Sequence, residues 1–228
     1  MLSRKNNPKQ TIENIISISA KLFSEKGYER TSMQDIVDTL GMSKGAIFHH
    51  FNSKEDILNA VMKKQSEYTV QILNKWIDEM EGLTAKEKLI GILERNMNDR
   101  QIHSLDGALS SQIQNPHFVM ANMQDCVNKS APFFAQIMRE GKEDGTITTE
   151  FPDECAEVFF LLMNIWCDPV IFKCDISRLG SRLKFLQQIM IKMGVDIISD
   201  ELITNYLEFV KEIYRGKILH EQCNGCKD

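Results

Sequence analysis

The chain of 228 residues has little of what marks fibrous, disordered or disulfide-stapled proteins. It contains only 5 prolines and 12 glycines, which excludes collagen-like and low-complexity chains. Its 6 cysteines follow no framework spacing, and a chain of this length buries enough surface to hold a core without disulfides. The composition therefore indicates a globular protein with reduced thiols, built as one domain or two small ones.

The sequence also lacks an apolar run long enough to cross a membrane. The longest, Val158 to Cys167, is interrupted by Asn164 and is about half of the ~20 residues that a membrane helix needs. The first ten residues are polar and basic and do not resemble a signal peptide. We therefore expect a cytoplasmic protein that does not enter membranes.

Motifs of catalysis and cofactor binding are missing as well. There is no glycine-rich phosphate loop, no His-Glu-x2-His and no nucleophile turn. The sequence thus predicts no catalytic residue, no cofactor and no metal. The C-terminal segment carries His220, Cys223 and Cys226, which would need a fourth ligand to hold zinc. An idle tail is the simpler interpretation, and a thiol- or metal-sensing tail is the alternative.

What the sequence does have is charge that is segregated along the chain. Residues 1–65 carry 10 lysines and arginines against 7 aspartates and glutamates, or +3, whereas residues 66–228 carry 17 against 25, or −8. This asymmetry favours a basic N-terminal segment that meets a polyanion and an acidic remainder with another task.

Apolar residues recur at helical spacing along nearly the whole chain, and strand alternation and hairpin signals are absent. Thr31 with Gln34 forms a predicted capping box, and Ser43 and Ser53 cap the next two helices. We expect helices over residues 11–26, 31–40, 43–51, 53–81, 84–101, 105–114, 116–144, 153–167, 177–194 and 199–215. The predicted fold is all-α, with a three-helix head joined by a long fourth helix to an all-helical body.

Two of the short helices are separated by a tight turn at Gly41 and Met42, which is the pattern of a helix-turn-helix. In this motif the second helix places its N-terminal residues in the major groove of DNA, while the first crosses the backbone. Hydroxyls, helix-start N–H groups and lysines at both edges of the motif suit phosphate contacts. The predicted DNA-binding residues are Thr31, Ser32, Ser43, Lys44, Gly45, Ala46, Phe48, His49 and Lys54.

Residues 10–65 closely resemble the head of the TetR family of bacterial transcriptional repressors. The resemblance is carried by Gly27-Tyr28, Thr31-Ser32-Met33, Asp35-Ile36-Val37, Leu40 through Phe51, and Ser53 through Leu58. It implies a homodimeric repressor that binds double-stranded operator DNA and holds a small ligand in its body. Ala46 and Phe48 stand where the family often has Thr and Tyr, so two possible hydroxyl contacts are missing. We assign residues 1–65 to DNA binding and residues 66–228 to ligand binding and dimerisation.

Leucines and methionines on the helix 177–194 alternate steps of four and three, the seam expected where one helix packs on a similar helix. Packing within one subunit explains this spacing nearly as well. We favour a dimer because one short recognition helix per chain needs a second copy to gain affinity on a near-palindromic operator. The predicted interface comprises Val158, Phe159, Leu162, Leu179, Leu183, Leu186, Met190 and Met193.

Methionines and aromatic residues at helical spacing in the body are more often core than pocket, but adaptable thioethers suit apolar ligand sites. We expect a small apolar or amphipathic ligand near His103, Met123, Phe134, Met138, Met163 and Trp166. A different class of function, a helical enzyme or adaptor with an incidental helix-turn-helix, remains the alternative. Salt-dependent binding to palindromic DNA distinguishes the two.

Overall fold

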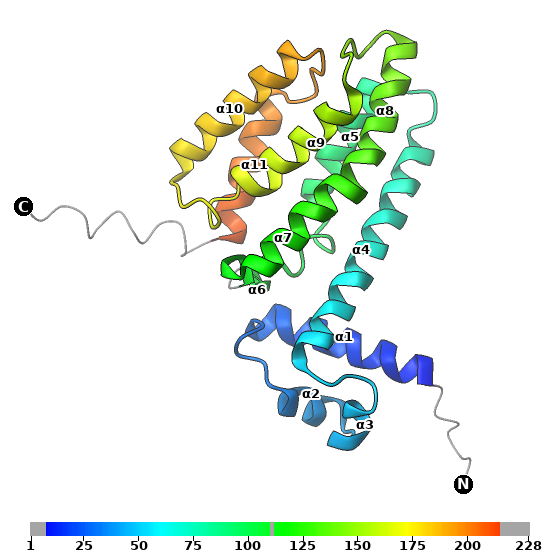
Figure 1. Cartoon of the computed structure of the whole chain (residues 1–228), viewed down its shortest axis with the longest axis vertical. Coiled ribbons are helices and arrows are strands. Elements are labelled where there is room, and N and C mark those ends of the chain that lie inside the picture. The colour runs from blue at the N-terminus through cyan, green and yellow to red at the C-terminus, as the bar shows by residue number, and fades with distance from the viewer. Residues whose placement is uncertain (1–7, 110–111, 215–228) are drawn as a thin grey trace, which may run out of the picture. The chain divides into compact units, whose positions relative to one another are not determined.

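The computed structural model describes residues 8–109 and 112–214, and all regular structure in these ranges is helical (Figure 1). The prediction of an all-α fold is confirmed. The α-helices are α1 (Pro8–Lys26), α2 (Met33–Leu40), α3 (Lys44–Phe48), α4 (Lys54–Glu79), α5 (Ala85–Asn98), α6 (Asp106–Leu109), α7 (Pro116–Asp125), α8 (Ala131–Asp144), α9 (Pro152–Leu161), α10 (Ile176–Lys192) and α11 (Asp200–Ile213). None of these helices is both long and apolar enough to span a membrane.

Some body helices are less regular than the sequence pattern predicts. The segment expected as one helix over 116–144 consists of α7, a π-helical turn η2 (Cys126–Ser130) and α8. The segment 153–167 is α9 followed by a second π-helical turn, η3 (Leu162–Trp166). The helix expected over 105–114 is reduced to α6 and a 3₁₀ turn, η1 (Gln112–Gln114). π-Helical turns are rare and are often found at functional sites.

The chain forms two compact units. The first comprises residues up to Asn74 together with a segment that begins at Gln101, and the second comprises Lys75–Arg100 and the chain from Gln112 onward. Hydrogen bonds tie the added segment to the first unit: the Ser24 hydroxyl donates to the Ser104 carbonyl at 2.9 Å, and Gln65 Nε2 donates to the Gln101 carbonyl at 2.7 Å. The first unit is thus larger than the 1–65 segment.

Both units have apolar cores that match the helical stripes of the sequence. In the first unit, Ile15, Phe23, Ile36, Ile47 and Ile57 are fully buried. In the second unit, the largest fully buried side chains are Leu89, Ile92, Met138, Ile147, Leu179, Leu186 and Met190. Because α2 and α3 each bury an isoleucine against the same core, their other faces are held in a fixed orientation for contact with solvent or a partner.

One polar side chain in the core of the first unit is buried without a hydrogen bond. The Ser19 hydroxyl on α1 is fully buried and has no hydrogen-bond partner. We expect Ser19→Ala to raise the free energy of unfolding by about 1 kcal/mol, because it removes an unpaired hydroxyl and leaves almost no void. Ser17→Ala on the exposed side of α1 is the control, since it gives the same gain in helix propensity and removes only the exposed hydrogen bond that Ser17 accepts from Lys64 Nζ at 3.1 Å. Urea unfolding of both variants tests this, and equal stabilisation by the two would contradict it.

Candidate functional site

The first helix of the motif, α2, begins at a capping box formed by Ser32 and Asp35. The Ser32 side chain accepts the N–H of Asp35 at 3.1 Å, and the Asp35 carboxylate accepts the N–H of Ser32 at 2.8 Å. The capping box predicted from the sequence at Thr31 and Gln34 lies one residue too early, so that prediction is wrong. The hydrogen bond from the Ser32 hydroxyl, together with Lys26, holds the pKa of the Asp35 carboxyl well below its ordinary value.

These contacts change what Thr31 and Ser32 can offer to DNA. Thr31 is only 1% exposed, and its hydroxyl donates to the Gly27 carbonyl at 2.9 Å. Thr31 therefore closes the α1–α2 corner and is not available to a phosphate, which corrects its predicted role. Ser32 is exposed, but both its N–H and its hydroxyl donate to Asp35. A phosphate at Ser32 would have to displace that carboxylate.

The second helix of the motif, α3, is short and firmly placed. Gly41 ends α2 in the left-handed conformation with φ of 63°, which makes the tight turn possible. The Ser43 hydroxyl caps α3 by accepting the N–H of Ala46 at 3.2 Å, and Ile47 is fully buried beneath the helix. Ser43 is thus used as a helix cap, and the remaining face of α3 points away from the core.

The outward face of α3 carries a lysine, an aromatic ring and an open position. Lys44 is exposed, its Nζ lies 5.5 Å from the Phe48 ring centroid, and it forms no ion pair with any described residue. Phe48 is itself 38% exposed. A Cβ atom built on Gly45 meets nothing within 4 Å. A cation, an apolar surface and free space therefore adjoin one another, as contact with phosphates and base edges requires.

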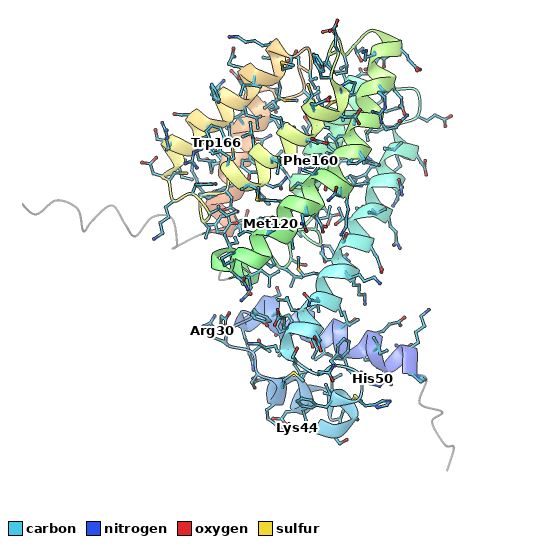
Figure 2. The ribbon with its side chains drawn as sticks, in the orientation of Figure 1. Arg30, Lys44, His50, Met120, Phe160 and Trp166 are labelled. Carbon is cyan, nitrogen blue, oxygen red and sulfur yellow. The ribbon has the colours of Figure 1, made fainter. Side chains whose placement is uncertain are left out.

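Two histidines follow α3. Their rings lie 5.1 Å apart at an interplanar angle of 67°, and His49 is exposed whereas His50 is half-buried. Figure 2 shows Lys44 and His50 on the side of the first unit formed by α2 and α3. His49 is the exposed C-cap residue of α3, directly after Phe48.

Lys54, the second predicted phosphate contact, is engaged within the head. At the start of α4, its Nζ donates to the Tyr28 carbonyl at 2.9 Å and lies 4.2 Å from the centroid of the Tyr28 ring. These contacts fasten α4 to the α1–α2 corner. Lys54 thus has a structural partner that Lys44 lacks.

We expect Lys54→Met to lower the free energy of unfolding by about 1–2 kcal/mol, because it removes a charge-assisted hydrogen bond and a cation–π contact while keeping the apolar stem. Lys44→Met, on an exposed side chain, is the control and should change stability by less than about 0.5 kcal/mol. Urea unfolding measures both. If Lys54→Met leaves the free energy of unfolding unchanged but weakens the dependence of DNA binding on salt, Lys54 contacts a phosphate and is not a structural residue.

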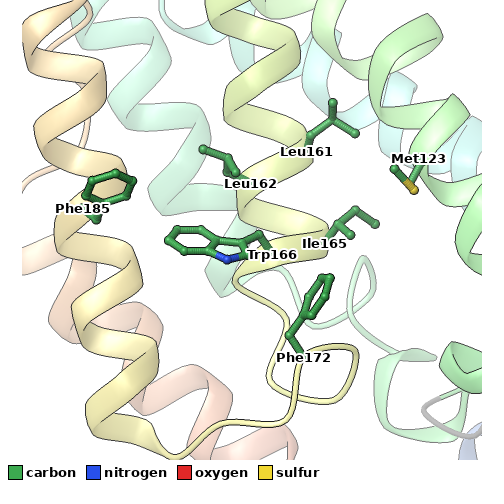
Figure 3. Close-up of a pocket in the computed structure, with 7 residues that line it drawn as sticks. All are labelled: Met123, Leu161, Leu162, Ile165, Trp166, Phe172 and Phe185. Atoms are coloured by element: carbon green, nitrogen blue, oxygen red, sulfur yellow. The ribbon is translucent and has the colours of Figure 1, made fainter.

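The second unit contains an open apolar hollow with a volume of about 350 Å³. Figure 3 shows its lining, which comes from α7, the end of α9, η3, the loop after η3, and α10. The lining residues are Met123, Leu161, Leu162, Ile165, Trp166, Phe172 and Phe185. The π-helical turn η3 supplies three of them, so the irregularity that the sequence pattern did not predict lies at this hollow.

Two of the six predicted ligand residues, Met123 and Trp166, line the hollow. Phe134 and Met138 are buried in the core, where the Phe134 ring lies 4.8 Å from that of Phe160, and they do not line this hollow. Met163 and His103 do not line the hollow. His103 belongs to the first unit and contacts Asp106 through Nδ1 at 2.7 Å.

Most of the residues predicted to form the dimer interface are buried in the core of the chain itself. Phe159, Leu179, Leu183, Leu186 and Met190 are each at most 2% exposed, so they have no surface left for a second copy. Their assignment to an interface is wrong, because the seam of α10 is its inward stripe. The large apolar residues that are exposed on α9 and α10 are Val158, 41% exposed, Phe185, 57% exposed, and Ile191, 42% exposed. Leu162 is half-buried, and Met193 is exposed just after α10.

The cysteines of the second unit are poor candidates for thiol chemistry. Burial raises the pKa of Cys126 to about 11 and that of Cys167 to about 12, so both remain protonated at neutral pH. Among the described residues, no group of three or more metal-ligating side chains could hold an ion. His220, Cys223 and Cys226 lie outside the described residues.

A helix-turn-helix head continuous with a helical body defines the class of DNA-binding regulators, and comparison with known proteins specifies the family. Residues 15–61 match the model of the bacterial regulatory proteins of the tetR family. Residues 95–189 match the model of the tetracyclin repressor-like C-terminal domain. The two matches together cover more than half of the chain. The protein belongs to the TetR family of bacterial transcriptional regulators, as the resemblance of residues 10–65 predicted.

Individual relatives are distant. The HTH-type transcriptional regulator UidR of Escherichia coli (strain K12) is 24% identical over 144 residues, which is 61% of this chain and 70% of that protein. A transcriptional regulator from Cytophaga hutchinsonii is 19% identical with a TM-score of 0.58, over 89% of this chain and 94% of that one. A regulator from Saccharomonospora viridis, solved in complex with choline, is 19% identical with a TM-score of 0.56, over 90% and 96%. The two structures support the fold.

Proposed function

We propose that this protein is a homodimeric repressor that binds a near-palindromic operator through α3 and releases it when the body binds a small ligand. The observation that carries the proposal is the face of α3, where the exposed Lys44 and Phe48 stand beside the open Gly45. Ser43, Ala46 and His49 border this face and complete the proposed DNA contacts, while Thr31 and Lys54 hold the motif together. We assign residues 1–65 to DNA binding and residues 66–228 to ligand binding and dimerisation.

Selection of bound duplexes from a random DNA pool tests the proposal. The expected result is a near-palindrome with half-sites one helical turn or a little more apart, because two recognition helices related by a two-fold axis must reach successive major grooves. Binding of the selected duplex should weaken steeply with rising salt. Recovery of no enriched sequence would overturn the proposal and favour an enzyme or adaptor with an incidental helix-turn-helix.

Dimerisation is proposed through the outward face of α9 and α10, where Val158, Leu162 and Phe185 leave apolar surface exposed or half-exposed. Such surface on one face of a helix pair is typical of an interaction site. Phe185 and Leu162 also line the hollow, so a second copy would lie along its open side. Ligand binding and the packing of the two copies would then share residues.

The proposed response to ligand is a shift between two conformations of the dimer. A ligand that prefers a conformation whose two α3 helices no longer match successive grooves lowers operator affinity in proportion to that preference. The hollow supplies a site of about 350 Å³ for such a ligand. The choline of the Saccharomonospora viridis structure shows that a protein of this fold accepts a small organic cation. In this chain, however, the guanidinium of Arg182 lies close to the Trp166 ring of the hollow, and its positive charge disfavours a bound cation.

A further inference from the structure

Arg182 on α10 is a cation beside the hollow that has no counter-ion among the described residues. Its guanidinium carbon lies 5.4 Å from the ring centroid of Trp166 and 6.0 Å from that of Phe172, and both rings line the hollow. No carboxylate of residues 8–109 or 112–214 forms an ion pair with it. A charge in apolar surroundings is unfavourable unless it is paired.

The hydrogen bonds of this guanidinium all come from one nitrogen. Nη1 donates to the Trp166 carbonyl at 2.9 Å, to the Phe172 carbonyl at 3.1 Å and to Cys174 Sγ at 3.4 Å. Nε is enclosed and has no acceptor, and Nη2 donates to no described residue. The N–H groups of Nε and Nη2 lie side by side on one edge of the guanidinium, an edge that can grip a carboxylate with two parallel hydrogen bonds.

Two acidic side chains close to Cys174, Asp168 and Asp175, accept hydrogen bonds from backbone groups. Asp168 Oδ1 accepts the N–H of Val170 at 2.7 Å and that of Ile171 at 3.0 Å, which shapes the loop after η3. Asp175 Oδ1 accepts the N–H of Arg178 at 2.7 Å and caps α10. Neither carboxylate forms an ion pair with Arg182, so the Nε–Nη2 edge has no acceptor among the described residues.

We propose that the hollow binds an amphipathic organic acid, whose carboxylate pairs with the Nε–Nη2 edge of Arg182 while its apolar part lies against Leu161, Ile165 and Phe185. This inference rests on the proposed ligand-responsive function and names the class of ligand. Phe172, 47% exposed on the loop between η3 and α10, would have to shift to let the carboxylate reach the enclosed Nε. The same guanidinium repels an organic cation placed on the Trp166 and Phe172 rings.

Three probes of one shape and different charge test the proposal on the full chain. Phenylbutyrate, the neutral phenylbutyramide and the cationic phenylbutylamine are titrated by isothermal calorimetry. We expect the acid to bind at least about tenfold more tightly than the amide, since hydrogen bonds to charged groups are the stronger ones. The amine should bind more weakly than either. Equal affinity for acid and amide, preference for the amine, or no binding of any probe would overturn the proposal.

Variants of one residue then locate the preference. Arg182→Gln should bind acid and amide equally, whereas Arg178→Gln, an exposed arginine one turn earlier on α10, should keep the wild-type ratio. The ratio within each variant is the readout, because a loosened hollow lowers both affinities together. If Arg182→Gln does not fold, Arg182→Lys is used in its place. It keeps the positive charge but lacks the two parallel N–H donors, so it should still reduce the ratio of acid to amide affinity. A ratio that survives both substitutions contradicts the role of Arg182.

Operator binding is measured separately with no probe present. Loss of operator binding by the wild-type chain counts against the proposed repressor, whereas a lost preference for the acid counts against the ligand class. The two failures are therefore distinguishable.

Discussion

Replacing Lys44 by alanine is expected to weaken operator binding roughly sixty-fold at about 0.1 M salt. Each phosphate that a lysine neutralises contributes about 0.9 to the slope of log affinity against log salt concentration, and the proposed homodimer would lose two such contacts. If the two proteins bind equally at 1 M salt, a slope that is lower by about 1.8 gives an affinity about sixty-fold lower at 0.1 M salt. Lys44 is exposed and forms no ion pair with a described residue, so its removal should leave folding unchanged. Fluorescence anisotropy of labelled operator over a salt series measures both quantities.

Two control variants separate phosphate contact from sequence reading. Lys44→Arg keeps the charge and should retain the wild-type slope. Gly45→Ser places a side chain on the outward face of α3, where a Cβ meets nothing within 4 Å, so it should alter sequence preference with the slope nearly intact. A folded Lys44→Ala with unchanged affinity and slope would show that α3 is not the element that reads DNA.

The helix-turn-helix could be predicted because its signals are local. Helical spacing places Ile36 and Ile47 inside, and Gly41 supplies the left-handed residue that the turn requires. The capping box was misplaced by one residue because Thr31 and Ser32 are both good N-cap types. Only packing decides between them: the Thr31 hydroxyl meets the Gly27 carbonyl across the α1–α2 corner, which leaves Ser32 to cap α2.

The roles of the two lysines show a second limit of sequence reasoning. Lys44 and Lys54 both stand at helix starts, where charge and position favour phosphate contact. The structure distinguishes them through a residue far away in sequence, since the Tyr28 carbonyl accepts a hydrogen bond from Lys54 but nothing comparable meets Lys44. A contact between residues 28 and 54 has no signature in local spacing.

The body was predicted least well, because its packing also depends on contacts between residues that are far apart in sequence. The steps of four and three on α10 correctly mark one apolar stripe, but the spacing of Leu179, Leu183 and Leu186 does not state which neighbour covers it. That neighbour is the chain's own core. Arg182 adjoins this stripe in sequence, and a charged residue next to an apolar stripe was the signal that could have indicated a polar group at the proposed ligand site.

Phe185→Asp is expected to convert the protein to a monomer and to lower operator affinity by at least about a hundredfold. In a two-fold interface the substitution occurs twice, so two carboxylates are placed where apolar surface was to be buried. A monomer engages a single half-site and loses much of the affinity and specificity of the paired site. Sedimentation velocity gives the oligomeric state, and anisotropy of labelled operator gives the affinity.

Because Phe185 also lines the hollow, a second substitution is needed to separate the interface from the ligand site. Val158→Asp lies on the outward face of α9 and outside the hollow lining, so it should dissociate the dimer without changing the preference for the acid probe. Leu83→Asp, at an exposed leucine between α4 and α5, is the matched control and should leave the dimer intact. If Phe185→Asp and Val158→Asp both remain dimeric, the outward face of α9 and α10 is not the dimer interface. Dissociation by Phe185→Asp alone would instead confine the interface to the α10 end of that face, next to the open side of the hollow.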